Sequence, residues 1–466
     1  MASPFSRLPL ELLEEIDTYL TARERYQLIL LDKTSSKIFK QFLYHLITFN
    51  SWYQVEKILY NMEKEPLLFE QTKALDIRYL HSHFHQSQRF LRIALEFCGN
   101  VGLLKVGNSS WISQFYRPGA ADLSDFPVLP KLRKLEINCG NWQMIENLMT
   151  FFSKCPNLES LKLLDLSYHF APSQAELLHD VFPSLQELCL DCIHSGPNLL
   201  QLMQPIPIPD EPCAFMKRFS LAADSRYDFM PLLQYIPQKY PNLENLDLTG
   251  DEVFVRNVQI TEELESAVYQ FLDGCNNLKS IRLVNVPSTD SFLGYYMDPV
   301  RRNSSSLEKL ELVNSHVGVS SDRFNLLSWS AMPSIKVLDI TLSPQILHNP
   351  RSFCYKLRSG VMLKDLRISI GQDGRSSSNI LSIHWILESC PSLVSLTLDS
   401  SFLGVVNDPV TGLPLSTVQE YNLERLVITN CTFKNEIWSY IEKHCPKLKF
   451  RFINKSRSDD DGSRYP

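Results

Sequence analysis

A nine-residue pattern repeats along most of this chain and restricts the folds that are open to it. The pattern reads CPNLESLKL at 155–163, FPSLQELCL at 182–190, YPNLENLDL at 240–248 and CPSLVSLTL at 390–398. A pattern that returns at nearly constant spacing indicates a repeat architecture, in which each copy is one small unit stacked on the next. The chain has 466 residues, too many for one ordinary compact core, but a stack can reach this length because each unit contacts only its neighbours.

The centre of the pattern is Leu-x-x-Leu-x-Leu, with Ile, Val, Phe or Met allowed at the leucine positions. Its copies begin 26 to 35 residues apart, at Val101, Leu132, Leu158, Leu185, Met216, Leu243, Leu278, Leu307, Ile335, Leu363, Leu393 and Leu423. Weaker copies at 72–77 and 448–452 extend the series at both ends. Loops of different length at one edge of the stack would produce this uneven spacing.

Each copy combines two hydrophobic periodicities. At 161–163 and 310–312 leucines alternate with a charged residue, which predicts a strand with one buried face. Between the copies, apolar residues recur at helical spacing, as in 142–152, 264–272 and 380–387. Parallel strands need a crossover connection, and a helix is the usual one. The sequence therefore predicts an α/β solenoid with parallel strands on the concave face and helices on the convex face.

The residues before the array predict three short helices. An apolar stripe with a period of four residues begins at Leu12 and follows a proline, which the first turn of a helix tolerates. Thr21 followed by Glu24 is a capping-box signal for a second helix, and a third is expected after 34–36. Three short helices bury little, so part of their apolar surface is expected to contact another protein or the array. Alternatively, they serve only as a cap on the first repeat.

The same N-terminal residues have a family resemblance. LPLEL at 8–12, LILL at 28–31 and the apolar pair Phe39 and Phe42 are similar to an F-box, over about residues 5–46. In that family the segment binds the Skp-type adaptor of a cullin–RING ubiquitin ligase, which implies the same partners here. The adaptor-binding residues implied by the resemblance are Leu8, Pro9, Leu12, Leu13, Ile16, Leu20, Leu28, Leu31 and Phe39.

The repeats, with Cys or an aromatic residue before Pro, resemble the leucine-rich repeats that follow F-boxes. Together the two resemblances imply a substrate-recognition subunit of an SCF-type E3 ubiquitin ligase, whose repeats bind a target protein. The alternative is a non-catalytic interaction scaffold outside ubiquitination. We divide the chain into an F-box-like three-helix domain at 1–48, a helical bridge with a degenerate first repeat at 49–99, the array at 100–453 and a disordered tail at 454–466.

The residues between and beside the last two leucines of each copy are expected to point outward, onto the concave surface. They mix both charges without a dominant stripe, which fits either a solvated face or a mosaic that binds the polar surface of a protein. The candidate target-binding residues are Lys162, Arg218, Asp247, Arg282, Glu311, Asp339, Arg367 and Arg425.

Net charge and cysteine content restrict the binding partners and the cellular compartment that we expect for this protein. A net charge of −6 gives no basic field for phosphate backbones, so nucleic acid is not an expected partner. Eleven cysteines, scattered and odd in number, indicate reduced thiols and hence the cytoplasm, the nucleus or both. The N-terminus does not read as a signal peptide, and no run of about 18 apolar residues occurs, so we expect no membrane partner.

Two small clusters could in principle hold a metal. His81, His83 and His85 alternate, so on a strand they would share one side and could support metal-dependent hydrolysis. Cys189 and Cys192 form a lone C-x-x-C. The histidines have no obvious fourth ligand nearby, the C-x-x-C has no second cysteine pair, and the chain contains no G-x-S-x-G, H-E-x-x-H or Walker A motif. We therefore expect no metal, no cofactor, no catalytic residue and no enzymatic activity.

Overall fold

A computed structural model describes a large part of the chain, in two compact units, Met1–Gln201 and Leu202–Pro466. The described residues are 8–49, 51–78, 84–107, 126–139, 142–166, 172–192, 211–223, 229–250, 262–286, 307–313, 334–342, 350–358, 360–370, 380–399, 402–404, 420–433 and 436–455. The division between the units falls inside the array predicted at 100–453, and each unit is described by itself.

The first unit begins with three helices at the predicted places, namely α1 (Leu10–Thr18), α2 (Ala22–Leu31) and α3 (Lys33–Leu43). The capping box of α2 is present, because the Thr21 hydroxyl accepts the Glu24 amide and the Glu24 carboxylate accepts the Thr21 amide. Helix α3 begins earlier than expected. The Asp32 carboxylate accepts the amide and the hydroxyl of Ser35, each at 2.8 Å, and so satisfies a first turn that the sequence pattern placed before the helix.

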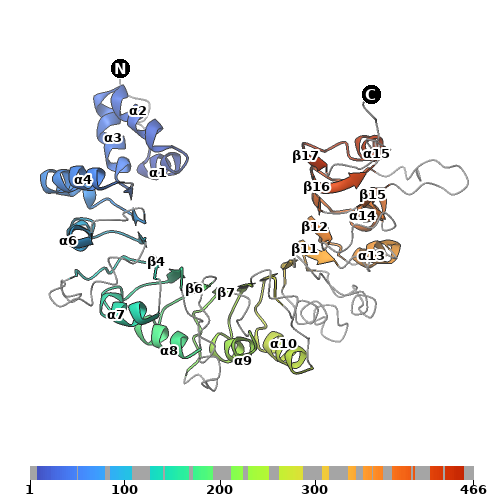
Figure 1. The fold of residues 1–466 in the computed structure, drawn as a ribbon. Coiled ribbons are helices and arrows are strands. Elements are labelled where there is room, and N and C mark those ends of the chain that lie inside the picture. The colour runs from blue at the N-terminus through green and yellow to red at the C-terminus, as the bar shows by residue number, and fades with distance from the viewer. Residues whose placement is uncertain are drawn as a thin grey trace, which may run out of the picture. The chain divides into compact units, whose positions relative to one another are not determined.

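The three helices have a small core of their own. Leu13 from α1 and Phe39 and Phe42 from α3 are buried together, with Leu20, Leu28, Ile29 and Ile38 packed against them. The rings of Phe39 and Phe42 meet edge to face, with centroids 5.9 Å apart. These helices therefore pack as a small bundle at the start of the first unit (Figure 1).

The rest of the first unit is a parallel sheet with helices on one face. Its strands are β1 (Leu46–Thr48), β2 (Ala74–Ile77), β3 (Leu103–Val106), β4 (Lys134–Asn138), β5 (Ser160–Leu164) and β6 (Glu187–Cys192), and each pairs with the next. Its helices are α4 (Trp52–Lys64), α5 (Pro66–Phe69), α6 (Phe84–Phe97), α7 (Trp142–Phe152) and α8 (Pro172–Val181). The sheet thus begins at β1, a strand that the sequence did not predict.

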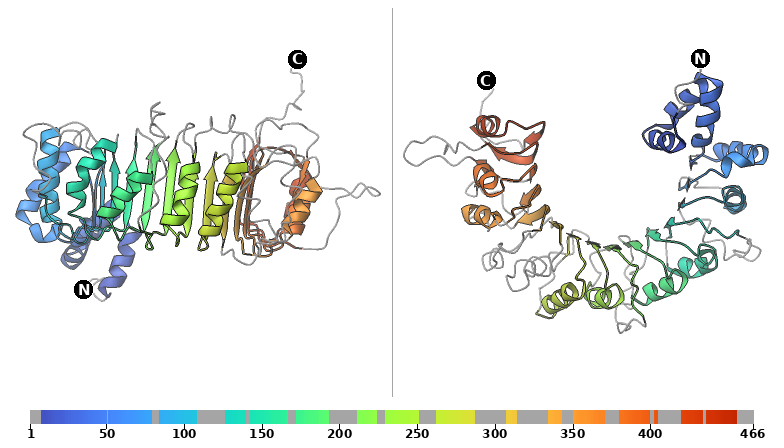
Figure 2. Two further views of the ribbon diagram at one scale, coloured as in Figure 1. Left: turned by 90° about the horizontal axis from the view of Figure 1, so that it is seen from below. Right: turned by 180° about the vertical axis from the view of Figure 1, so that it is seen from behind.

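The second unit repeats the same arrangement. Its parallel sheet runs β7 (Arg218–Ala223), β8 (Asn245–Thr249), β9 (Ser280–Val284), β10 (Lys309–Val313), β11 (Val337–Leu342), β12 (Asp365–Ile370), β14 (Ser395–Asp399), β16 (Arg425–Phe433) and β17 (Phe450–Lys455). Its helices are α9 (Met230–Lys239), α10 (Glu262–Gly274), α13 (Pro350–Leu357), α14 (Ile383–Ser389) and α15 (Glu436–His444). Within each unit the helices cover one face of the strands and leave the other face open (Figure 2). We call this second surface the open face.

The burial pattern confirms the repeat assignment. The first residue of each of the twelve predicted copies is buried, and the inner leucines of neighbouring strands are in register, as Leu161 is with Leu188 and Leu310 with Leu338. Cys155, Cys275, Cys390 and Cys445 occupy the turn between helix and strand, where a small apolar side chain fits. The fold is therefore an α/β array of parallel strands and crossover helices, as the sequence predicts.

Two local features differ from the sequence-based expectation. Ile380 was expected to begin a helix, but Ile380–Ser382 is a short strand, β13, because it pairs with β15 (Phe402–Gly404), and the helix begins at Ile383. Asn454 and Lys455, assigned to the tail, extend β17 by pairing with Thr429 and Cys431 of β16. Each difference arises from strand pairing across the array, which the local sequence does not show.

Candidate functional site

The nine adaptor-binding residues implied by the F-box resemblance divide into two groups in the structure. Leu13 and Phe39 are core residues, Leu20 and Leu28 pack against them, and Ile16 is half-buried. Leu8, Pro9, Leu12 and Leu31 are exposed. Because a core side chain holds the helices together and a surface side chain contacts a partner, only the second group is available for direct docking.

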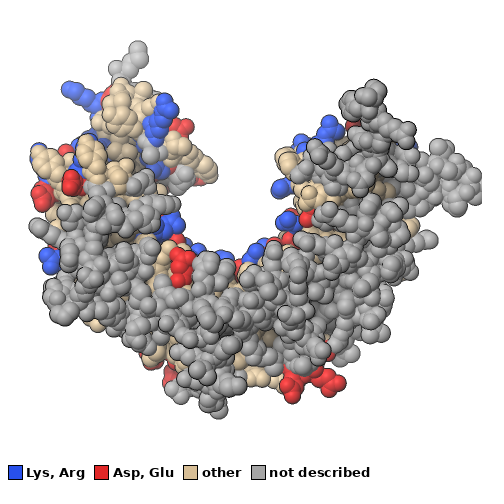
Figure 3. All heavy atoms as spheres, in the orientation of Figure 1, with Lys and Arg blue, Asp and Glu red and all other residues tan. Residues whose placement is uncertain are grey.

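The structure adds exposed apolar residues that the sequence pattern did not single out. Leu30 is 66% exposed, about as much as the predicted Leu31 at 64% and more than Leu12 at 46%, and Tyr19 and Tyr26 are exposed as well. A signal was present in LILL at 28–31, since four consecutive apolar residues extend around a helix and cannot all face one core. Residues other than Lys, Arg, Asp and Glu cover much of this helical segment in the view of Figure 3 (top left). Large apolar side chains exposed on one small segment, when they form a patch, are typical of protein-binding surfaces.

All eight candidate target-binding residues lie on strands of the array, at positions of the open face. Pairing places five of them in one row across the second unit, in the order Asp247, Arg282, Glu311, Asp339 and Arg367. Both signs of charge are represented along this row. Each cation therefore has a carboxylate on a neighbouring strand.

The row is largely compensated by internal ion pairs. An Arg282 nitrogen lies 3.0 Å from an Asp247 oxygen, and another lies 3.7 Å from Glu311. Lys309 adds a contact of 3.0 Å to Glu311, and Arg367 lies 3.7 Å from Asp339. Exposed pairs of this kind contribute little to stability, but they occupy the charged groups that a partner would need. The mixed charges that the sequence placed on this surface thus mostly form ion pairs with one another.

Asp339 is the least accessible residue of the row, with 8% of its surface exposed. Burial, partly offset by Arg367, raises the pKa of Asp339 to about 6, and the nearby Glu311 and Asp365 carboxylates add to the rise. A carboxyl group in this position has little contact with solvent. We infer that Asp339 contributes to the packing of the sheet more than to binding.

The open face of the first unit has a second charge network. Arg78 pairs with Asp76 at 2.8 Å and with Glu136 at 3.1 Å, and Lys105 lies 3.5 Å from Glu136. Burial by itself would raise the pKa of Asp76, but hydrogen bonds from Arg78 outweigh it and lower the pKa. Lys162 lies in the same row, beside a shallow depression of about 170 Å³.

The last strands of the second unit differ from the rest of the open face. The sequence pattern placed Phe450 and Phe452 in a degraded copy of the repeat, but pairing sets them beside Arg425 and Val427, in open-face rows. Their side chains are 48% and 49% exposed. The guanidinium carbon of Arg425 lies 5.4 Å from the centre of the Phe450 ring. This aromatic pair is a candidate binding feature that the sequence did not reveal.

The two metal candidates gain no support from the described residues. His81 and His83 lie outside them, and His85 lies in α6 with its side chain not described. Cys189 faces the open side of β6 and Cys192 the buried side, because residues three apart in a strand point to opposite faces. Among the residues described, no group of three or more His, Cys, Asp or Glu side chains is placed to hold a metal ion.

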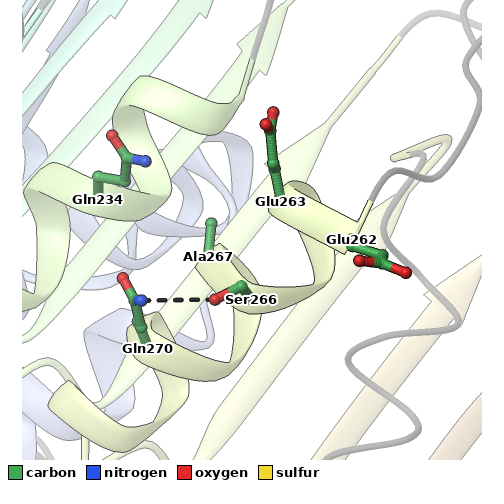
Figure 4. A pocket seen from close by; sticks show the side chains of 6 residues that line it. All are labelled: Gln234, Glu262, Glu263, Ser266, Ala267 and Gln270. Carbon is green, nitrogen blue, oxygen red and sulfur yellow. Dashed lines mark hydrogen bonds between the residues drawn. The ribbon is translucent and has the colours of Figure 1, made fainter.

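A groove lies between α9 and α10 in the second unit. It is lined by Gln234, Glu262, Glu263, Ser266, Ala267 and Gln270 (Figure 4). The Gln270 amide donates to the Ser266 hydroxyl at 3.4 Å, and the two glutamates lie in the first turn of α10, where the helix dipole favours negative charge. The acidic groups of this groove thus have a structural explanation.

The strands and helices themselves define the class of this protein, which is a repeat protein with a leucine-rich-repeat fold. In the described part of the chain, no helix has both the length and the hydropathy that a membrane span requires. No protein-family model matches the sequence, and no curated protein matches it either.

Several solved structures have a similar arrangement of strands and helices. A protein from Bacteroides fragilis shows 11% identity and a TM-score of 0.34 over 87% of this chain and 84% of its own. The yeast complex of Rad7 and Elc1 shows 16% identity and a TM-score of 0.37 over 88% of this chain and 96% of the matched chain. The leucine-rich repeat-containing protein LegL7 from Legionella pneumophila shows 14% identity and a TM-score of 0.33 over 82% of this chain and 94% of its own. At this level of similarity we base the fold assignment on the strand pairing and burial described above.

Proposed function

We propose that this protein is the substrate-recognition subunit of an SCF-type E3 ubiquitin ligase. The N-terminal helices would bind a Skp-type adaptor and, through it, a cullin–RING ligase, while the repeats bind a target protein. The chain itself would catalyse nothing and need no cofactor. Its contribution would be to raise the effective concentration of the target near the transferred ubiquitin, in the cytoplasm or nucleus.

The observation that supports this proposal most directly is the exposed apolar surface of helices α1 and α2. Leu12, Leu30 and Leu31 face solvent although Leu13, Phe39 and Phe42 already provide a core for the helices. Complete burial of an exposed leucine side chain is worth about 1.5–3 kcal/mol, and these partly exposed leucines forgo a sizeable fraction of that free energy. A partner that covers them would recover this free energy, and the F-box resemblance over the same helices suggests an adaptor as that partner.

Co-expression with a Skp-type adaptor and a cullin tests the proposal. We expect the full chain to co-purify with both. The double variant Leu12→Asp and Leu31→Asp should lose the adaptor, because it places two charges in an apolar interface while leaving the buried core unchanged. Leu67→Asp, at a leucine of α5 that is more exposed than Leu12 or Leu31, is the control and should retain the adaptor.

The outcomes separate the proposed role from its alternative. If the double variant keeps the adaptor while its circular dichroism is unchanged, the docking surface proposed here is wrong. Recovery of the adaptor without the cullin would favour an interaction scaffold outside ubiquitination.

A further inference from the structure

The open face of the second unit is not uniform in its charge compensation. Along the row from Asp247 to Arg367, every charge has an oppositely charged neighbour within 3.7 Å. A partner that binds there must first displace these internal pairs. Since desolvating and breaking a paired charge costs free energy, this row is a poor source of binding energy.

The open face of the last three strands has a different composition. The row from Asp247 to Arg367 continues through Thr397 of β14, Val427 of β16 and Phe452 of β17. The adjacent open-face row of the same three strands holds Ser395, Arg425 and Phe450. These residues of the last three strands include one cation and no carboxylate. Arg425 has no ion-pair partner among the described residues, in contrast to Arg282 and Arg367.

The nearest acidic groups on these strands are engaged elsewhere. Glu424, which precedes Arg425, pairs with Lys449 at 2.9 Å. Asp399, in another row of β14, accepts hydrogen bonds from Thr429 at 2.8 Å and from Asn430 at 3.1 Å. Within the described strands, the positive charge of Arg425 is therefore uncompensated.

Two exposed phenylalanines border this cation. Phe450 is the direct cross-strand neighbour of Arg425, and Phe452 lies two residues further along β17, on the same face. Their separation along the strand is about 7 Å, close enough for one ligand segment to contact both. Aromatic and arginine side chains are also the types enriched among residues that dominate binding energy.

From this arrangement we propose that Arg425, Phe450 and Phe452 form the recognition site of the array, and that its ligand is a partner-protein segment with a carboxylate next to an apolar side chain. Arg425 would pair with the carboxylate through its planar guanidinium, and the two rings would cover the apolar side chain. This inference rests on the proposed function, in which the array binds a protein target, and it specifies the chemistry of that target. We favour a carboxylate over a phosphorylated segment because the site has a single uncompensated cation, whereas phosphate sites usually combine several donors.

A displayed library of random short peptides, selected on the full-length protein, tests the site although the target is unidentified. We expect the enriched peptides to share Asp or Glu within one or two positions of an aromatic or aliphatic residue. A synthetic peptide of the most enriched sequence should then bind the wild-type chain, measured by fluorescence anisotropy.

Two variants and one control locate the binding. Phe450→Thr combined with Phe452→Thr keeps residues suited to a strand and should weaken peptide affinity about tenfold or more, because aromatic anchors supply much of the binding energy at such sites. Arg425→Glu should weaken it by a similar factor and should bind better to a peptide whose acidic residue is replaced by Lys. Tyr355→Thr removes an aromatic residue of α13 that is more exposed than either phenylalanine, and it should leave peptide binding unchanged.

The contrary results are equally specific. Enrichment of neutral or basic peptides, or equal binding by the phenylalanine variant, would overturn the proposal. If the protein selects phosphorylated peptides from a phosphorylated library in preference to peptides with Asp or Glu, the ligand is a phosphorylated segment and the carboxylate proposal is wrong. If a chain ending at residue 455 binds the peptide and the full chain does not, the acidic tail containing Asp459–Asp461 occupies the site, and a partner protein does not.

The adaptor assay keeps this inference distinct from the proposed function. The Phe450 and Phe452 variant should still co-purify with the adaptor, and the Leu12 and Leu31 variant should still bind the peptide. If the wild-type protein binds the adaptor but selects no acidic peptide, the recognition-site proposal is wrong and the proposed function is unaffected.

Discussion

The Nε atom of Arg25 lies 2.6 Å from a carboxylate oxygen of Asp17, and both side chains are largely buried. Arg25 also donates to the Asp17 carbonyl oxygen at 2.9 Å. This pair connects the end of α1 with the first half of α2. It therefore links the two helices that expose Leu12 and Leu31.

Replacing Arg25 with Ala should destabilise the N-terminal helices. The substitution leaves the Asp17 carboxylate in a mostly buried position without its cation, and lost hydrogen bonds to a charged group cost about 1.5–3 kcal/mol. Hydrogen exchange of the amides of α1 and α2 measures the effect locally. Lys40→Ala, which breaks an exposed pair with Glu65 at 2.7 Å, is the control and should change exchange little. Equal protection in the two variants would show that the buried pair is not structurally important.

Asp339 should make the stability of the array depend on pH. The pKa of Asp339 is raised to about 6 in the fold and is about 3.9 in an unfolded chain, so the folded state binds more protons between these values. The free energy of unfolding should therefore fall as the pH rises from about 4 to 6, by up to about 2–3 kcal/mol from this group.

Asp339→Asn removes the titrating group and should flatten that slope. The Asn variant should also be more stable than the wild type at pH 7, because it avoids the cost of ionising a buried carboxyl. Urea unfolding of both proteins between pH 4 and 7 measures the difference. A slope unchanged by the substitution would assign the pH dependence to other groups.

The cysteine thiols should differ sharply in reactivity. All eleven lie in described parts of the chain as reduced thiols, and Cys189 is the one with intermediate exposure, while the others are buried. Burial raises the pKa of Cys155, Cys275 and Cys390 to about 12, so at pH 8 they hold almost no thiolate.

Brief treatment of the folded protein with iodoacetamide, followed by mass spectrometry, should therefore find Cys189 labelled first. Cys189→Ser should remove the fast phase and leave the slow one. Rapid labelling of Cys155 in the folded protein would contradict its burial.

Gly250 should tolerate no side chain. A Cβ atom at this position would lie 2.5 Å from the carbonyl oxygen of Asn285, in the adjacent repeat. Because that contact is with backbone, the two strand ends must separate, and we expect Gly250→Ala to cost about 1–3 kcal/mol. Gly99→Ala, where nothing lies within 4 Å, is the control and should change stability by less than about 0.5 kcal/mol. Thermal unfolding of both variants measures the difference, and equal midpoints would contradict the tight approach.

Much of the fold could be predicted from the sequence because its signal is repetitive. Each copy of Leu-x-x-Leu-x-Leu independently predicts a strand with one buried face. Occasional substitutions such as Met216 or Ile335 therefore do not obscure the spacing of the repeats. The helix start signals at Thr21 and Trp142 are local as well and lie within a few residues of the observed boundaries. The strands β1 and β13 were missed because three residues carry too little pattern and depend on a neighbour for pairing.

The candidate sites were predicted less completely, because exposure depends on packing between segments. The sequence grouped Leu13 and Phe39 with Leu12 and Leu31 as apolar helix residues, and the packing of α1 against α3 separated the first two as core. It likewise identified the charges of Arg282 and Arg425 without showing that Arg282 is paired across the strands while Arg425 lies beside an aromatic ring.

The repeated pattern by itself thus determined that parallel strands and crossover helices stack in sequence order, since hydrophobic periodicity is a property of each short segment. The register between strands decided the rest. It set Phe450 beside Arg425 and Phe452 beside Val427 on the open face, because a shift of one residue in a strand exchanges the buried side for the exposed one. The register of β17 is set by its pairing with β16, and the local sequence of β17 does not specify that register.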